Sequence, residues 1–163
     1  MNMVILVLAL VIVIFGFVVF FGAPFLPTKR QQIESALDLL NLKKGQTLLE
    51  LGCGDGRVML VAAKRGIKVV GYELNPVLAL IARIRTWHYR QSTKIIWGNF
   101  WQAAWPKTDG IFVFLLDKYM QKLDKKIVQH ANNSTVKLAS FAFKVPGKKP
   151  TKTYNGVYLY EYK

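Results

Sequence analysis

The feature that most constrains this chain is a run of alternate glycines placed directly after a short apolar segment. Residues 47–51 are apolar enough for a buried strand, and the turn that follows, within ELGCGDG at 50–56, carries glycine at positions 52, 54 and 56. Glycines there let the backbone turn tightly and approach a ligand that a Cβ atom would exclude. Because ligands of open α/β sheets bind at the carboxyl ends of the strands, this turn predicts both a fold class and the position of a site.

The rest of the chain alternates between strand-like and helix-like segments. We expect helices at about 29–41, 57–65, 76–90 and 118–130, and strands at about 47–51, 68–73, 94–97, 110–116, 135–143 and 157–162. Thr28 begins a capping-box pattern before the first helix, and Asn75 would cap the third. Asn155-Gly156 is a hairpin signal. The order predicts an α/β, Rossmann-like, mostly parallel sheet with helices on both faces and an antiparallel C-terminal edge.

The spacing of the glycines separates two kinds of nucleotide-like ligand. A dinucleotide fingerprint is G-x-G-x-x-G, whereas this turn is G-x-G-x-G and Arg57 occupies the last glycine's place. Acidic residues crowd the turn, which suits a ligand with a sulfonium and an amino group better than one with two phosphates. Glu73 ends the second expected strand, 21 residues after Gly52, where a carboxylate can accept hydrogen bonds from ribose hydroxyls.

The N-terminal segment has a different character. Residues Met3 to Gly22 are twenty positions without a charge, which is the length that an α-helix needs to cross about 30 Å of hydrocarbon. We expect one transmembrane helix; a cleaved signal peptide is the alternative, but the segment lacks a basic start and an Ala-x-Ala site. Basic residues follow the run and none precedes it, so the rest of the chain is expected on the cytoplasmic side. The expected organisation is an anchor at 1–22, a connector and amphipathic helix at 23–46, and a domain at 47–163.

The chain is strongly basic, with 23 basic and 9 acidic residues and a net charge of +14. Such a charge attracts either the anionic leaflet of a membrane or nucleic acid, and the anchor favours the membrane. Cys53 is the only cysteine, which excludes an intrachain disulfide and agrees with a reducing compartment. His88 and His130 have no matching ligand cluster, so no metal site is expected.

At these residues the chain resembles class I S-adenosylmethionine-dependent methyltransferases, whose first motif is similar to E-L-G-C-G-D-G. Within that class it is most similar to the membrane-anchored protein-lysine methyltransferases of mitochondria and their bacterial relatives. Their Pro-Phe-x-Pro-Thr, Gly-Asp-Gly-Arg and Glu-Leu-Asn-Pro segments match residues 24–28, 54–57 and 73–76 in order. Looser similarity at 82–85, 98–101 and 114–116 extends the resemblance over nearly the whole chain.

The resemblance implies a cofactor, S-adenosylmethionine, and residues that would hold it. It implies that the methionine part lies against Glu50, Gly52, Gly54, Asp55 and Gly56, and the ribose against Glu73 in its segment with Leu74. Asn99 and Phe100 would border the adenine, and Thr28 would close over the cofactor. Phe114, Leu115 and Asp117, after the fourth strand, are where a channel for the methyl acceptor is expected.

The function implied by the resemblance is methylation of lysine on a membrane or membrane-proximal protein. One alternative keeps the fold and changes the acceptor to RNA or a lipophilic small molecule. A second is a membrane-bound module that binds a nucleotide or a partner without catalysis. The absence of an Arg-rich transit segment favours a bacterial plasma membrane over a mitochondrial inner membrane.

Overall fold

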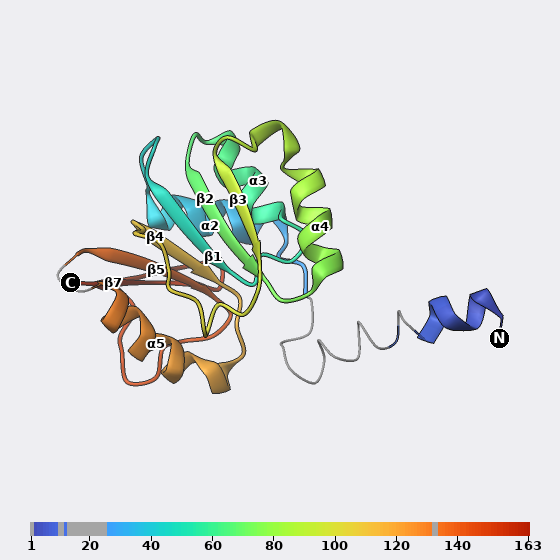
Figure 1. The fold of residues 1–163 in the computed structure, drawn as a ribbon. Helices are drawn as coiled ribbons and strands as arrows, with labels where there is room; N and C mark the ends of the chain where they lie inside the picture. The colour runs from blue at the N-terminus through green and yellow to red at the C-terminus, as the bar shows by residue number, and fades with distance from the viewer. Residues whose placement is uncertain (1, 10–11, 13–25, 132–133) are drawn as a thin grey trace.

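A seven-stranded sheet forms the centre of the domain, with the strand order β3-β2-β1-β4-β5-β7-β6 (Figure 1). The computed structural model describes residues 2–9, 12, 26–131 and 134–163. The strands are β1 Thr47–Leu51, β2 Lys68–Glu73, β3 Thr93–Trp97, β4 Gly110–Val113, β5 Val136–Phe141, β6 Lys152–Tyr154 and β7 Val157–Tyr162. The first five are parallel, while β7 is antiparallel to both β5 and β6. This confirms the mostly parallel sheet with an antiparallel C-terminal edge.

Helices cover both faces of the sheet, as expected (Figure 1). The core on one face joins side chains of α2 Arg30–Leu40, α3 Arg57–Lys64 and α4 Pro76–Arg85, and the core on the other face is built with α5 Asp117–Ala131. In β1, Leu48 packs in the first core and Leu49 in the second, and both side chains are fully buried. A strand that is apolar on both faces is typical of a parallel sheet between helical layers.

Three elements differ from the sequence prediction. β4 ends at Val113, its last pairing with β5, so that 114–116 leave the sheet. α4 ends at Arg85, where the Thr86 hydroxyl donates to the Ala82 carbonyl and a short 3-10 helix, η1 Trp87–Tyr89, follows. β6 was not predicted because its three residues are exposed and lack an apolar pattern; its pairing with β7 comes from the hairpin turn, in which Asn155 and Gly156 both have positive φ.

The start of α2 corrects another prediction. The N-cap is Lys29 and makes no side-chain capping bond, so the capping box expected from Thr28 does not form. Thr28 is instead buried, and its carbonyl accepts a hydrogen bond from Arg57 Nη1 at 3.5 Å.

Only part of the expected membrane segment is described. Residues 3–9 are helical and exposed, whereas 10–11 and 13–22 lie outside the described residues. No helix within the described ranges combines the length and apolarity needed to cross a bilayer.

Candidate active site

The glycine turn begins where β1 ends, between β2 and β4. Gly52, Gly54 and Gly56 have φ values of 85°, 53° and 78°, a left-handed backbone that favours glycine. The Gly52 and Cys53 amides both donate to the Tyr72 carbonyl, at 2.9 and 2.8 Å, which holds the turn against β2. The turn therefore lies at the point where strand order reverses, which is where open α/β sheets bind ligands.

Glu73 joins the glycine turn to the start of α4. One carboxylate oxygen accepts from the Gly54 amide and the other from the Asn75 amide, each at 2.8 Å. Asn75 in turn caps α4, as predicted, by accepting from the amides of Val77 and Leu78. A carboxylate has about four acceptor sites, so each Glu73 oxygen retains capacity for a ligand hydroxyl.

Glu50 is the one acid of the turn with an unsatisfied atom in the described part of the chain. Its side chain is buried, and Oε2 has no hydrogen-bond partner. Burial raises the pKa of Glu50 well above its ordinary value, and the nearby charges of Glu73 and Asp55 raise it further. A buried carboxylate without a partner is costly, so this atom indicates a cationic ligand group that would complete the site.

Asp55 is held by two arginines. Its Oδ2 lies 2.7 Å from Arg57 Nη2 and 2.6 Å from Arg85 Nη1. Burial opposes the charge of Asp55, but the hydrogen bonds from Arg57 and the positive charge of Arg85 outweigh it and lower the pKa. The carboxylate thus ties the glycine turn to α3 and α4, a structural role beside the cofactor contact that the resemblance implies.

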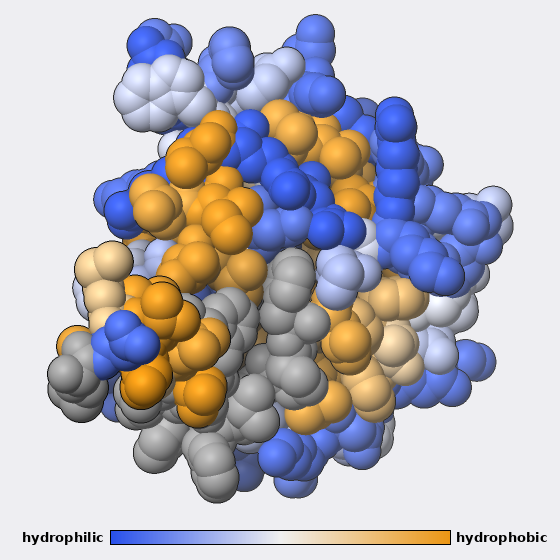
Figure 2. All heavy atoms as spheres, turned by 90° about the vertical axis from the view of Figure 1, so that its right-hand side faces the viewer, coloured by the Kyte–Doolittle hydropathy of each residue, from blue (hydrophilic) through white to orange (hydrophobic). Residues whose placement is uncertain are grey.

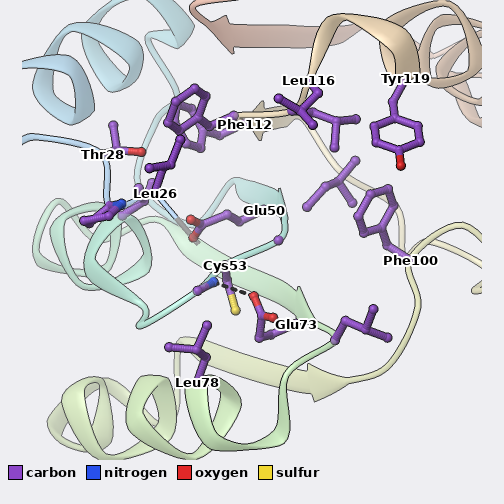
Figure 3. A pocket seen from close by; sticks show the side chains of 18 of the residues that line it. Leu26, Thr28, Glu50, Cys53, Glu73, Leu78, Phe100, Phe112, Leu116 and Tyr119 are labelled. Carbon is purple, nitrogen blue, oxygen red and sulfur yellow. Dashed lines mark hydrogen bonds between the residues drawn. The ribbon is translucent and has the colours of Figure 1, made fainter. Parts of the chain in front are cut away.

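These groups line a cavity of about 490 Å³, within the range of about 300 to 1,000 Å³ typical of ligand pockets. Figure 3 shows Glu50 and Glu73 directed into it from the ends of β1 and β2, with Phe100, Leu116 and Tyr119 on another side. Most predicted site residues line it: Thr28, Glu50, Gly52, Gly54, Asp55, Glu73, Leu74, Asn99, Phe100, Phe114 and Leu115.

Two predicted residues do not line the cavity. Asp117 begins α5 and is exposed, because the chain leaves the sheet after Val113 and the intervening residues occupy the cavity wall instead. Gly56 is the N-cap of α3, and a Cβ atom there would lie 2.9 Å from both Cα and Cβ of Ala82. Gly56 therefore permits close packing between the turn and α4.

We predict that Gly56→Ala lowers the free energy of unfolding by about 2 to 4 kcal/mol, since it adds overpacking against Ala82 to the cost of a left-handed alanine. Gly52→Ala is the matched control: its φ is similar, but nothing lies within 4 Å of the added methyl, so about 1 to 2 kcal/mol is expected. Chemical denaturation of the full chain in mild detergent measures both. Equal losses for the two variants would contradict the packing role.

The sequence reasoning missed cavity residues from several distant segments. They are Leu26, Pro27, Cys53, Arg57, Val58, Leu78, Gly98, Trp101, Phe112, Leu116, Tyr119, Lys122, Ala142 and Phe143. Ala142 and Phe143 follow the end of β5, so the rule that sites gather at carboxyl ends of strands could have found them. No local signal marks Lys122, which reaches the cavity from α5.

The strand order, the glycine turn and the acidic end of β2 define an S-adenosylmethionine-dependent methyltransferase. Solved structures agree on the fold. An RNA methyltransferase from Salinibacter ruber in complex with S-adenosyl-L-homocysteine superposes with a TM-score of 0.74 at 22% identity, over 84% of this chain and 92% of that one. A methyltransferase from Thiobacillus denitrificans, also in complex with S-adenosyl-L-homocysteine, superposes with a TM-score of 0.57 at 20% identity, over 76% of this chain and 53% of that one.

The chain belongs to the family of the ANTKMT methyltransferase domain, whose family model matches residues 50–152. It is 35% identical to a human lysine N-methyltransferase named for ATP synthase over 106 residues, 64% of this chain and 45% of that protein. It is 28% identical to a protein-lysine N-methyltransferase of Saccharolobus islandicus over 78% of this chain and 81% of that protein. The chain thus spans less than half the length of its human relative.

The site fits the methyl donor of this class. S-adenosylmethionine carries an ammonium group that could satisfy Glu50 Oε2 and ribose hydroxyls that the free acceptor sites of Glu73 could receive. The glycines at 52 and 54 leave the backbone open to close approach.

Proposed function

We propose that this chain methylates lysine side chains of a membrane or membrane-proximal protein, using S-adenosylmethionine. The observation that carries the proposal is the family match over residues 50–152, together with relatives named as lysine N-methyltransferases. The proposal includes the N-terminal membrane helix with the domain on the cytoplasmic side, for which a bacterial plasma membrane is our first expectation. The exposure of Met3 to Leu8, each at 52% or more, supports that helix, because a helix exposing only apolar side chains suits hydrocarbon.

The residues of the cavity would serve two tasks. Glu50 and Glu73 would bind and orient the cofactor, which when bound supplies an electrophilic methyl group on a sulfonium. The wall contributed by Phe114, Leu116 and Phe143 is apolar and would exclude water from the acceptor. A lysine acceptor must lose its proton, against an ordinary pKa of about 10.4, and an apolar wall disfavours the ammonium form.

Lys122 adds a positive charge to this part of the cavity. Its Nζ lies 4.6 Å from the ring centroid of Trp101, and both residues line the cavity. A neighbouring cation disfavours a second ammonium, so Lys122 would lower the pKa of an incoming lysine. It would thereby favour the neutral amine that can accept a methyl group.

We predict that Lys122→Met moves the acidic limb of the pH profile of kcat/KM to higher pH by about 0.5 to 1 unit, since one unit corresponds to about 1.4 kcal/mol. The methionine keeps the apolar stem and removes the charge. Lys118→Met is the control, because Lys118 is an exposed cation one turn earlier on α5, and it should leave the profile in place. Superimposable profiles for Lys122→Met and the wild type would contradict this role.

The proposed function is tested by labelling. The full chain, reconstituted in lipid vesicles, is incubated with methyl-labelled S-adenosylmethionine and membranes from which the native enzyme has been deleted. Label on lysine, located by mass spectrometry and absent with Gly54→Val, would support the proposal. Cofactor binding without any transfer would instead favour the non-catalytic binding module.

RNA is the second candidate acceptor, because the net charge is +14 and the Salinibacter ruber neighbour is named an RNA methyltransferase. Transfer of label to RNA and none to protein would favour it. Binding to RNA should then weaken steeply between about 50 and 200 mM salt, as phosphate contacts release counterions.

A further inference from the structure

The outward face of α4 is apolar and exposed. Leu78, Ala79 and Ala82 pack into the core, as expected of one helical face. The opposite face carries Val77, Leu80, Ile81 and Ile84, whose exposure ranges from 38% to 67%. Their spacing of three and four residues forms one stripe along the helix. A helix on the surface of a water-soluble domain is normally polar on this face, so the stripe indicates an apolar partner.

Exposed tryptophans extend the stripe beyond both ends of α4. Trp87 follows the C-terminal end, in η1, and is 61% exposed. Trp97 is 63% exposed, and its indole N–H donates to the Leu74 carbonyl at 3.1 Å, which fixes the ring beside the N-terminal end. Tryptophan is enriched where membrane meets water, because its ring is apolar and its N–H is polar.

The surroundings of the stripe are positively charged. The segment 74–97 contains four basic residues and no acidic residue. Of these, Arg83, Arg90 and Lys94 are exposed, and the Arg90 guanidinium lies 5.0 Å from the centroid of the Trp87 ring. Figure 2, which looks at the side of the domain where α4 lies in Figure 1, shows hydrophobic surface bordered by hydrophilic side chains. This combination is complementary to an anionic lipid surface, where each nearby Lys or Arg adds about 1 kcal/mol.

The chain approaches the domain next to this face. Leu26 and Leu78, the latter on α4, line the same cavity. Leu26 lies only four positions after Gly22, the end of the apolar run, so the two residues are at most about 14 Å apart along a fully extended chain. A bilayer that holds the run would therefore lie close to both α4 and the cavity.

We propose that the α4 stripe, with Trp87 and Trp97, rests on the anionic surface of the bilayer and places the cavity beside the lipid headgroups. The inference rests on the membrane-anchored form of the proposed function and deepens it: the acceptor lysines would lie at headgroup level. Contact with the bilayer removes apolar side chains from water and leaves the arginines at the phosphates.

Tryptophan quenching in vesicles tests this. All four tryptophans lie between residues 87 and 105, so none is in the apolar run. The full chain is reconstituted in phosphatidylcholine and phosphatidylglycerol vesicles with or without brominated acyl chains. Bromination should quench roughly half of the emission, because two of the four tryptophans belong to the interfacial face. Trp87→Phe combined with Trp97→Phe should remove that quenching.

A second variant distinguishes the stripe from the anchor. Leu80→Glu with Ile84→Glu changes only exposed positions, so the variant should still bind S-adenosylmethionine and float with the vesicles, yet lose the quenching. Loss of flotation by the wild type would mean that the anchor proposal fails. A wild-type chain that floats but shows no bromolipid quenching, or quenching unchanged by the two glutamates, would overturn the α4 proposal. Dimers that bury the tryptophans in its place would overturn it in favour of a second copy.

Discussion

Glu50→Gln is expected to weaken S-adenosylmethionine binding by at least about 30-fold and, at the same time, to stabilise the cofactor-free protein. Loss of one partner of a buried charge pair costs about 2 to 5 kcal/mol, and Glu50 Oε2 is the buried atom that the cofactor's ammonium would satisfy. Without cofactor, the ionised carboxylate is a liability that the neutral amide lacks. Calorimetric titration and thermal unfolding measure the two effects on the same samples.

The stabilisation should depend on pH in a defined direction. The fold raises the pKa of Glu50, so the folded protein binds this proton more tightly than the unfolded chain. Stability from this group is complete below the ordinary glutamate pKa and is lost as pH rises through the raised value. The advantage of Glu50→Gln should therefore be absent at acidic pH, grow with rising pH and level off above the raised pKa.

An exposed carboxylate provides the control for Glu50. Glu161→Gln lies on the surface of β7 and should change neither cofactor affinity nor the pH dependence of stability. Unchanged affinity in Glu50→Gln would mean that the cofactor's ammonium binds elsewhere. A variant less stable than the wild type at every pH would mean that Glu50 is satisfied in the free protein.

Glu73→Ala should reduce cofactor affinity by about 100-fold or more and lower the free energy of unfolding by about 2 to 4 kcal/mol. The substitution leaves the amides of Gly54 and Asn75 without their acceptor, and hydrogen bonds to charged groups contribute about 1.5 to 3 kcal/mol each. It also removes the acceptor of the ribose hydroxyls. Titration of the cofactor and chemical denaturation test both effects.

Asn75→Ala separates these effects. It removes the cap of α4, at a cost of about 1 kcal/mol, while the Glu73 carboxylate remains. Its affinity for the cofactor should stay within a few-fold of the wild type. If Glu73→Ala bound the cofactor as the wild type does, the acidic end of β2 would have only a structural role.

Local patterns located the elements of the domain well where periodicity and turn chemistry act alone. β2 and β7 span the predicted residues, Asn75 caps α4 as predicted, and Asn155-Gly156 forms its hairpin. Element ends were less predictable. β4 stops at Val113 because Phe114 to Leu116 are needed in the cavity wall, and nothing in their apolar character distinguishes a strand from a wall.

The sequence by itself determined the fold class, the glycine turn and the acid at the end of β2, because glycine stereochemistry and apolar periodicity are local properties. The tertiary structure decided what each acid of the site does. Asp55 meets Arg85, thirty positions away, and becomes a structural ion pair, whereas Glu50 is buried without a partner. It also decided that the second apolar face of α4 stays exposed. Burial and charge environment depend on segments distant in sequence, and these meet only in the folded chain.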